Sequence, residues 1–170
     1  MVATGSDRVT QRSNNDMKDK DLVGKTVVSM ADGARVGTVK DLVFQGLELT
    51  SLLIRGERGE GLLAYKSIRA NGPDAITIES YTLVDWNGGR TLEPDNRDIH
   101  ELRKLSVVDG DGKMLGHLHD LTMDDLGHVE DISVRTEGVF GVGAHESVIP
   151  GTRVRAVGSN LITVDSAPRN

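Results

Sequence analysis

The chain has 170 residues, of which 37% are hydrophobic but only 3% aromatic, and 20 are glycine. A core must therefore be built from Val, Leu and Ile, and the glycines indicate many tight turns, a mixture typical of short strands and hairpins. The net charge of -6 argues against phosphate neutralisation, and hence against direct nucleic-acid binding. The sequence has no cysteine, which excludes disulfides, thiolate nucleophiles and Cys-ligated metal centres.

The first twenty residues are polar and contain only Val2, Val9 and Met17 as larger apolar side chains. Burial of so few apolar groups does not offset the entropy lost on ordering the segment, so we expect residues 1–20 to be a flexible tail. No apolar run approaches the length of a membrane span, and the N-terminal segment lacks the apolar stretch of a secretory signal. These features predict a soluble, cytoplasmic protein without a membrane span.

From Leu22 onward the sequence repeats itself. Residues 27–42 match residues 106–121 at a shift of 79, and residues 68–80 match residues 154–166 at a shift of 86. Two matching blocks in the same order indicate an internal duplication. The repeated glycines are interpreted as structural turn residues, and they are Gly33 and Gly37 in the first unit and Gly112 and Gly116 in the second.

Each unit has the pattern of strands. An apolar run turns at Asp-Gly, a favoured hairpin dipeptide, and returns. In the first unit we expect strands around residues 27–30, 36–44, 49–54, 62–65 and 75–78, with at most one short helical turn near 65–69. In the second unit we expect them around residues 105–108, 114–123, 129–134, 146–149 and 161–164.

The domain boundaries follow from these strands. We expect a first domain at 21–80, a linker at 81–97, a second domain at 98–167 and a C-terminal tail at 168–170. The linker begins apolar and ends polar, and Trp86 is expected to pack between the two units.

The unit resembles the PRC-barrel family. In the first unit the matching residues are Leu22, Gly24-Lys25, Val27, Gly33, Val36-Gly37, Val39 and Asp41, and in the second they are 154–158 and 161–164. The resemblance implies an all-β fold, with two tandem small antiparallel β-barrels related by internal duplication. The family includes the cytoplasmic part of the photosynthetic reaction-centre H subunit and the C-terminal domain of the ribosome-maturation factor RimM.

The resemblance also implies that the protein is a docking surface and not an enzyme. Closure of a small barrel leaves its outer face and loops for partners. We therefore expect a non-enzymatic adaptor, without a cofactor or catalytic residues, that binds another protein or a larger assembly. Two alternatives stay open. One is an accessory module in RNA metabolism or ribosome assembly, and the other is a metal-binding protein.

The metal alternative rests on the histidines, which all lie in the second unit. His117 and His119 alternate along a predicted strand and would share one face, as in a two-histidine metal site. Oxygen ligands could come from Asp120, Asp124, Asp125 and Glu130. Exposed strand residues beside a core-facing Leu118 explain the same alternation without a metal, so we assign no metal ligands.

Two glycine-rich segments are read as turns or loops. The segment 109–112 lacks the ligands of a calcium loop, and the segment 138–143 lacks the lysine and the helix of a phosphate loop. Phe140 in the second segment could contact a partner. We expect a pH-sensitive partner surface around His117, His119 and His128, because histidine titrates near neutral pH.

Overall fold

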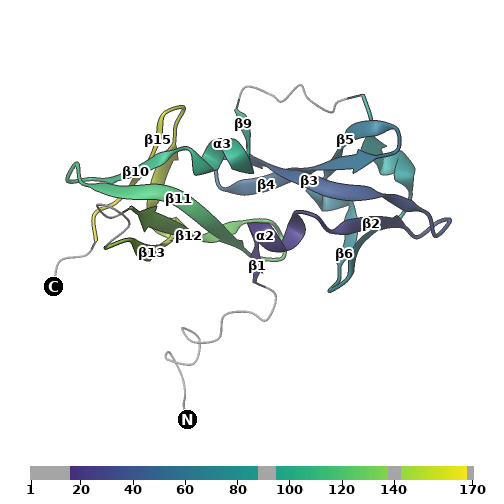
Figure 1. Ribbon diagram of the computed structural model, residues 1–170, viewed down its shortest axis with the longest axis horizontal. Coiled ribbons are helices and arrows are strands. Elements are labelled where there is room, and N and C mark those ends of the chain that lie inside the picture. The colour runs from purple at the N-terminus through teal and green to yellow at the C-terminus, as the bar shows by residue number, and fades with distance from the viewer. Residues whose placement is uncertain (1–15, 88–94, 138–142, 168–170) are drawn as a thin grey trace, which may run out of the picture.

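The computed structural model describes residues 16–87, 95–137 and 143–167, and these residues form two strand-rich units (Figure 1). The first unit contains β2 (Thr26–Ser29), β3 (Arg35–Gln45), β4 (Glu48–Gly56), β5 (Gly59–Ala64), η1 (Tyr65–Ser67), β6 (Ile68–Asn71), β7 (Ala75–Ile78), η2 (Tyr81–Leu83) and β8 (Val84–Asp85). The second contains β10 (Ser106–Asp109), β11 (Met114–Met123), β12 (Val129–Thr136), β13 (His145–Pro150), η3 (Gly151–Arg153), β14 (Val154–Val157) and β15 (Leu161–Val164).

The two sheets have the same topology. In the first unit the strand order is β6-β7-β2-β3-β4-β5-β8. In the second unit the order in the same direction is β14-β15-β10-β11-β12-β13. Neighbouring strands are antiparallel except β2 with β7 and β10 with β15, which are parallel. The all-β class and the duplication are confirmed, with one parallel pair in each unit in place of a purely antiparallel sheet.

The equivalent glycines have equivalent surroundings. A Cβ atom on Gly37 would lie 2.4 Å from the carbonyl oxygen of Arg55, and one on Gly116 would lie 2.4 Å from that of Arg135. A side chain at either position would therefore push two paired strands apart. Gly33 and Gly112 have φ values of 70° and 81°, the left-handed region that glycine adopts at low cost, in the hairpin turns that the sequence predicted.

The repeat is not in constant register through the first hairpin. Val27 pairs with Gly37, and Val107 pairs with Gly116, so Val107 and not Ser106 is the counterpart of Val27. The turn between the strands covers residues 30–34 in the first unit and the shorter range 110–113 in the second. The uniform shift of 79 was therefore wrong for the strand before the turn.

Each unit receives a strand and a short helix from the segment that precedes the other unit. β1 (Met17–Lys18) pairs with β11 of the second unit, and β9 (Asn96–Asp98) pairs with β3 of the first. The helices that follow are α2 (Asp19–Leu22) and α3 (Ile99–Arg103). Leu22, Ile99 and Leu102 are buried in one hydrophobic core that extends through both units.

This exchange corrects the expected boundaries. Residues 17–20, placed in a flexible tail, are strand and helix, because Met17 and Asp19 are buried against the second unit. The expected linker 81–97 contains η2, β8 and the first two residues of β9. Trp86, expected between the units, packs instead over Gly56 and Gly61 of the first unit.

Candidate functional site

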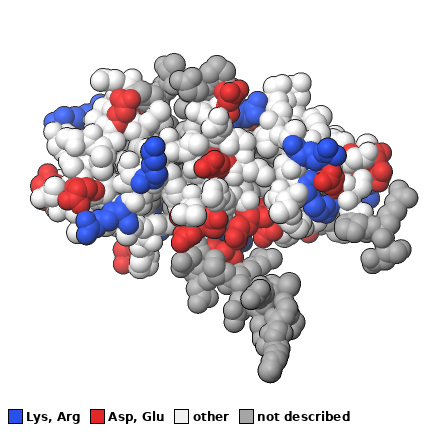
Figure 2. Space-filling model, turned by 180° about the vertical axis from the view of Figure 1, so that it is seen from behind, with Lys and Arg blue, Asp and Glu red and all other residues white. Residues whose placement is uncertain are grey.

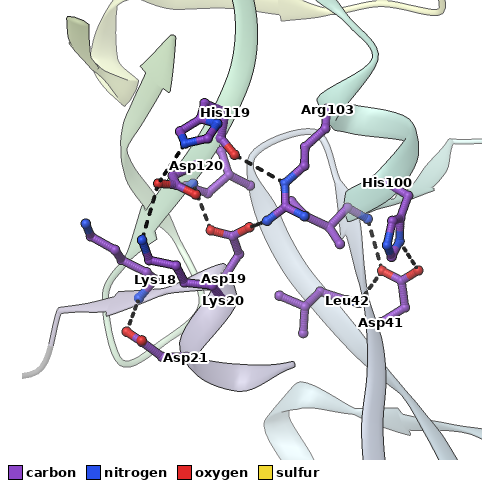
Figure 3. A network of polar contacts seen from close by, with 12 residues as sticks. Lys18, Asp19, Lys20, Asp21, Asp41, Leu42, His100, Arg103, His119 and Asp120 are labelled. Atoms are coloured by element: carbon purple, nitrogen blue, oxygen red, sulfur yellow. Dashed lines mark hydrogen bonds and ion pairs between the residues drawn. The ribbon is translucent and has the colours of Figure 1, made fainter. Parts of the chain in front are cut away.

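The junction of the two units is held by a buried carboxylate at the start of α2 (Figure 3). Asp19 has no solvent exposure, and its Oδ1 accepts a hydrogen bond of 3.1 Å from the backbone N–H of Leu121. Its Oδ2 pairs with the guanidinium of Arg103 on α3, and Arg103 Nε donates to the backbone oxygen of His119 at 3.2 Å. A buried carboxylate needs such partners, so α2 is fixed to both α3 and β11.

A second carboxylate holds the other helix to the first unit. Asp41 on β3 accepts from the backbone N–H of Leu42 at 2.8 Å and from that of Ile99 at 3.3 Å. Its Oδ2 lies 2.8 Å from Nδ1 of His100 (Figure 3). Asp41 therefore connects β3 to the start of α3, as Asp19 connects α2 to β11.

The turns of the two units also pair with each other. The N–H of Leu49 donates to the oxygen of Gly127 at 2.8 Å, and the N–H of Val129 donates to the oxygen of Leu47 at 2.9 Å. The Tyr65 hydroxyl donates to the oxygen of Asp125 at 3.1 Å. Burial, together with the charges of Asp125 and Asp124, raises the pKa of Tyr65, so this hydroxyl stays protonated and can donate.

A groove of about 940 Å³ opens where the units meet. Its lining includes Met17, Tyr65 and Ile68, and both Asp125 and Leu126 of the second unit. Leu126 is 68% exposed, the highest value among the large hydrophobic side chains in the described part of the chain. The groove therefore combines an apolar contact with backbone and side-chain polar groups from both units.

The groove is lined by charges of both signs. The first unit supplies Lys25, Lys66 and Arg69, and Lys25 Nζ donates to the side-chain oxygen of Asn71 at 2.7 Å and to the oxygen of Gly72 at 2.8 Å. Acidic groups come from both units and from the segment before β1, among them Glu48, Asp125 and Asp16. A partner that fills the groove would therefore meet charges of both signs.

The acidic side continues beyond the groove. Burial and then the neighbouring Asp16 raise the pKa of Glu130, with further contributions from Asp124 and Asp131. Figure 2 shows acidic side chains gathered along the lower middle of the face opposite to that of Figure 1. Carboxylates that lie close together repel one another, and a basic partner would relieve this repulsion.

The histidines predicted to form one partner surface have different neighbours. Nε2 of His117 lies 3.4 Å from Ser106 Oγ on β10, whereas Nε2 of His119 lies 3.8 Å from Asp120 Oδ2. His119 is the unpaired residue of a β-bulge between Leu118 and Asp120, and Leu118 between the two histidines is buried. His117 pairs with Arg135 and Arg135 pairs with Glu146, the carboxylate beside His119, so the two histidines lie on one face of the sheet.

His128 lies at the junction turn. Its Nδ1 is 3.3 Å from Asp124 Oδ2 and its Nε2 is 3.8 Å from Glu48 Oε1, so it bridges the two units. Phe140 lies outside the described residues. The structure thus brings one of the four predicted partner-binding residues, His128, close to the groove.

Among the described residues, two groups of side chains have metal-ligand composition. The ligand atoms of His119, Asp120 and Glu146 lie within 4.8 Å of one another, and so do those of Asp41, Asp98 and His100. The first group includes His119 and Asp120 from the predicted set but takes Glu146 as its third member. Lys20 Nζ lies 3.7 Å from Asp120 Oδ2 and already supplies a positive charge there.

The sequence did not reveal the residues that build the junction. Asp19 and Arg103 lie 84 positions apart, in segments predicted as a tail and as the start of the second domain, before its first strand. A signal was available for Asp41 and Asp120, because the Asp-Leu pair is repeated in both units. None of the described helices could span a membrane, and the longest, α3, has five residues.

Comparison with known proteins identifies the repeated unit. No curated protein matches the chain. The model of the PRC-barrel domain matches residues 14–89 and again residues 94–169, and each match includes the exchanged strand that precedes the unit. PRC-barrel domains are protein-interaction modules. The chain belongs to the PRC-barrel domain family and contains the domain twice.

Proposed function

We propose that the protein is a non-enzymatic, cytoplasmic adaptor that docks another protein of a larger assembly in the groove between its two units. The observation that carries the proposal is the groove itself, which both units line and at which Leu126 is 68% exposed. An exposed leucine beside a concave, mixed surface is typical of a protein contact. The absence of cysteine fits a reducing compartment.

The opposite charges of the groove favour a partner segment with both signs. Lys66 and Arg69 would attract acidic groups of the partner, and Asp16 and Asp125 would attract basic groups. Such complementarity determines orientation and the rate of association more than total affinity. Net repulsion from the wider acidic surface disfavours nucleic acid as the partner.

The test is capture of partners by the tagged full chain from a lysate of the cells that make it, followed by identification of the bound proteins. Leu126→Asp should abolish retention of the partner, because it places a charge in the apolar contact. Leu83→Asp is the matched control, since Leu83 is 42% exposed and does not line the groove. Equal retention by both variants would reject the groove as the docking site.

The histidines extend this proposal to pH. Protonation of His128 would turn its contacts with Asp124 and Glu48 into ion pairs at the edge of the groove. Retention of the captured partner should therefore differ between pH 6 and pH 8 in the wild type and not in His128→Gln. A double variant with His117→Gln and His119→Gln tests the rest of the expected surface. Unchanged retention of the partner between pH 6 and pH 8 in the wild type and in both variants would reject pH sensitivity.

A further inference from the structure

The two units have equivalent edge strands with different neighbours. Leu52 pairs with Leu63 of β5 in the first unit, and Ile132 pairs with Ile149 of β13 in the second, so β5 and β13 are counterparts. On its outer side β5 carries β8, with Val84 opposite Leu63. The chain thus covers the first edge with a strand of its own.

The edge of β13 is open within the described ranges, where no strand pairs with its outer side. Val148, the counterpart of Leu62, is 56% exposed. An uncovered edge presents unpaired backbone N–H and C=O groups, and it can accept a further strand. Natural edges are often blocked by lysine or proline; β13 has the sequence HESVIP, which contains no lysine, and its proline, Pro150, is the last residue of the strand.

The open edge also carries a carboxylate at the position of a carboxylate on the covered one. Glu60 of β5 pairs with Lys40 and, at 3.1 Å, with Arg55. Its counterpart Glu146 is exposed and has His119 in the position of Lys40, while Arg135 is opposite it as Arg55 is opposite Glu60. A hydrogen bond from Ser133 Oγ at 2.5 Å is the first cause of the lowered pKa of Glu146, so the carboxylate is ionised at neutral pH and can attract a cation.

The space beside the edge limits what can bind. A Cβ atom on Gly61 would lie 2.6 Å from Val84 and 2.8 Å from Trp86, so the bulky Trp86 fits only because this position is glycine. The counterpart of Gly61 in β13 is Ser147. A strand on β13 must therefore carry a small side chain opposite Ser147.

We propose that the outer edge of β13 binds an extended segment of a partner protein as an added antiparallel strand. The geometry of β8 on β5 sets the register. The segment has a β-branched residue opposite Ile149, any strand-forming residue opposite Val148, a small residue opposite Ser147 and Lys or Arg opposite Glu146. Main-chain hydrogen bonds supply affinity in this mode, and the alternate side chains supply specificity. The inference rests on the proposed adaptor function but uses a different surface from the groove.

The test uses the full chain and a fluorescein-labelled peptide, Thr-Val-Val-Ala-Lys-Thr, with binding followed by fluorescence anisotropy. Two control peptides have Glu in place of Lys, or N-methyl groups on alternate backbone amides, which block strand pairing. The unmodified peptide should bind, the Glu peptide should bind at least tenfold more weakly, and the N-methylated peptide should not bind. Hydrogen exchange should slow at the backbone amides of β13 when the peptide is present.

Variants of the chain complete the test. Glu146→Lys should reverse the preference to the Glu peptide, and Val148→Asp should weaken binding at least tenfold. Met114→Asp is the control, because Met114 is equally exposed at 56% and lies on β11. The inference is overturned if the peptide does not bind the wild type, if the N-methylated peptide binds equally well, or if Glu146→Lys leaves the preference unchanged. In each of these cases the wild-type chain would still capture its partner through the groove, and Leu126→Asp would still lose that partner. The failure of the strand-addition proposal can therefore be distinguished from the failure of the groove proposal.

Discussion

Replacement of Asp19 by alanine should destabilise the whole protein. The variant leaves the N–H of Leu121 without its acceptor and the guanidinium of Arg103 without its buried partner. Breaking a buried ion pair by removing one member costs about 3–5 kcal/mol. The Arg103 side chain is 36% exposed and can regain water, which places the expected loss at the lower end, about 3 kcal/mol.

The assay is denaturant unfolding followed by circular dichroism, with thermal unfolding in parallel. In a protein of this length each kcal/mol changes the melting temperature by roughly 2–4 °C, so Tm should fall by about 6–12 °C. Asp21→Ala is the matched control, because Asp21 lies on the same helix but makes only an exposed bond of 3.1 Å to the N–H of Lys18. It should cost less than about 1 kcal/mol.

A double-mutant cycle with Arg103→Ala separates the interaction energy between Asp19 and Arg103 from the contributions of their other contacts. The sum of the losses of unfolding free energy in the two single variants should exceed the loss in the double variant by at least about 1 kcal/mol. The reason is that substitutions of residues in one network are not additive. A loss in Asp19→Ala no larger than that in Asp21→Ala would refute the claim that this carboxylate fastens α2 to the second unit.

Three further predictions concern stability. Deletion of residues 1–20 should lower the free energy of unfolding by at least about 3 kcal/mol relative to deletion of residues 1–15, because only the longer deletion removes the buried Met17 and Asp19; equal urea midpoints would contradict this. Gly37→Ala should cost about 1–3 kcal/mol by forcing a Cβ atom against a carbonyl oxygen 2.4 Å away, and Gly72→Ala, where the nearest atom is 3.3 Å away, should cost less; equal losses on denaturation would refute the steric argument. Burial and neighbouring carboxylates raise the pKa of Glu130, so the folded state holds this proton more tightly than the unfolded state, and the stability associated with it is lost as pH rises. Glu130→Gln should therefore raise Tm at pH 7 in low salt but not below pH 4, and a Tm difference independent of pH would oppose this account.

The repeat, and with it the fold, could be predicted because its determinants are local. The Asp-Gly turns, and Gly37, which has no room for a side chain, recur at fixed spacing in the sequence. This spacing can be recognised without knowledge of the tertiary structure. The exchange of strands could not be predicted in the same way. The segment of α2 is mostly polar, and Asp19 acquires its role only from Arg103, 84 positions later. For that reason the local sequence pattern predicted residues 17–20 as part of a flexible tail.

The arrangement of the histidines could be predicted in part. Alternation along β11 places His117 and His119 on one face, with the buried Leu118 between them, but the bulge at His119 also brings this side chain close to Asp120 and Glu146. The sequence pattern of the second unit does not show where such an extra residue lies. His128 reached the junction through pairing of two turns from different units, which depends on tertiary structure alone.

The reciprocal exchange also governs the order in which the protein can be completed during synthesis. The sheet of the first unit lacks β9 until the chain has grown past Asp98, and the place of β1 on β11 does not exist until Met123 has been made. Buried apolar positions near Leu22 therefore stay open while the nascent chain lengthens by about one whole repeat. Such long-range closure slows folding and prolongs exposure of sheet edges. A chain interrupted after its first repeat would be released with an unfilled edge, although every residue of that repeat is present.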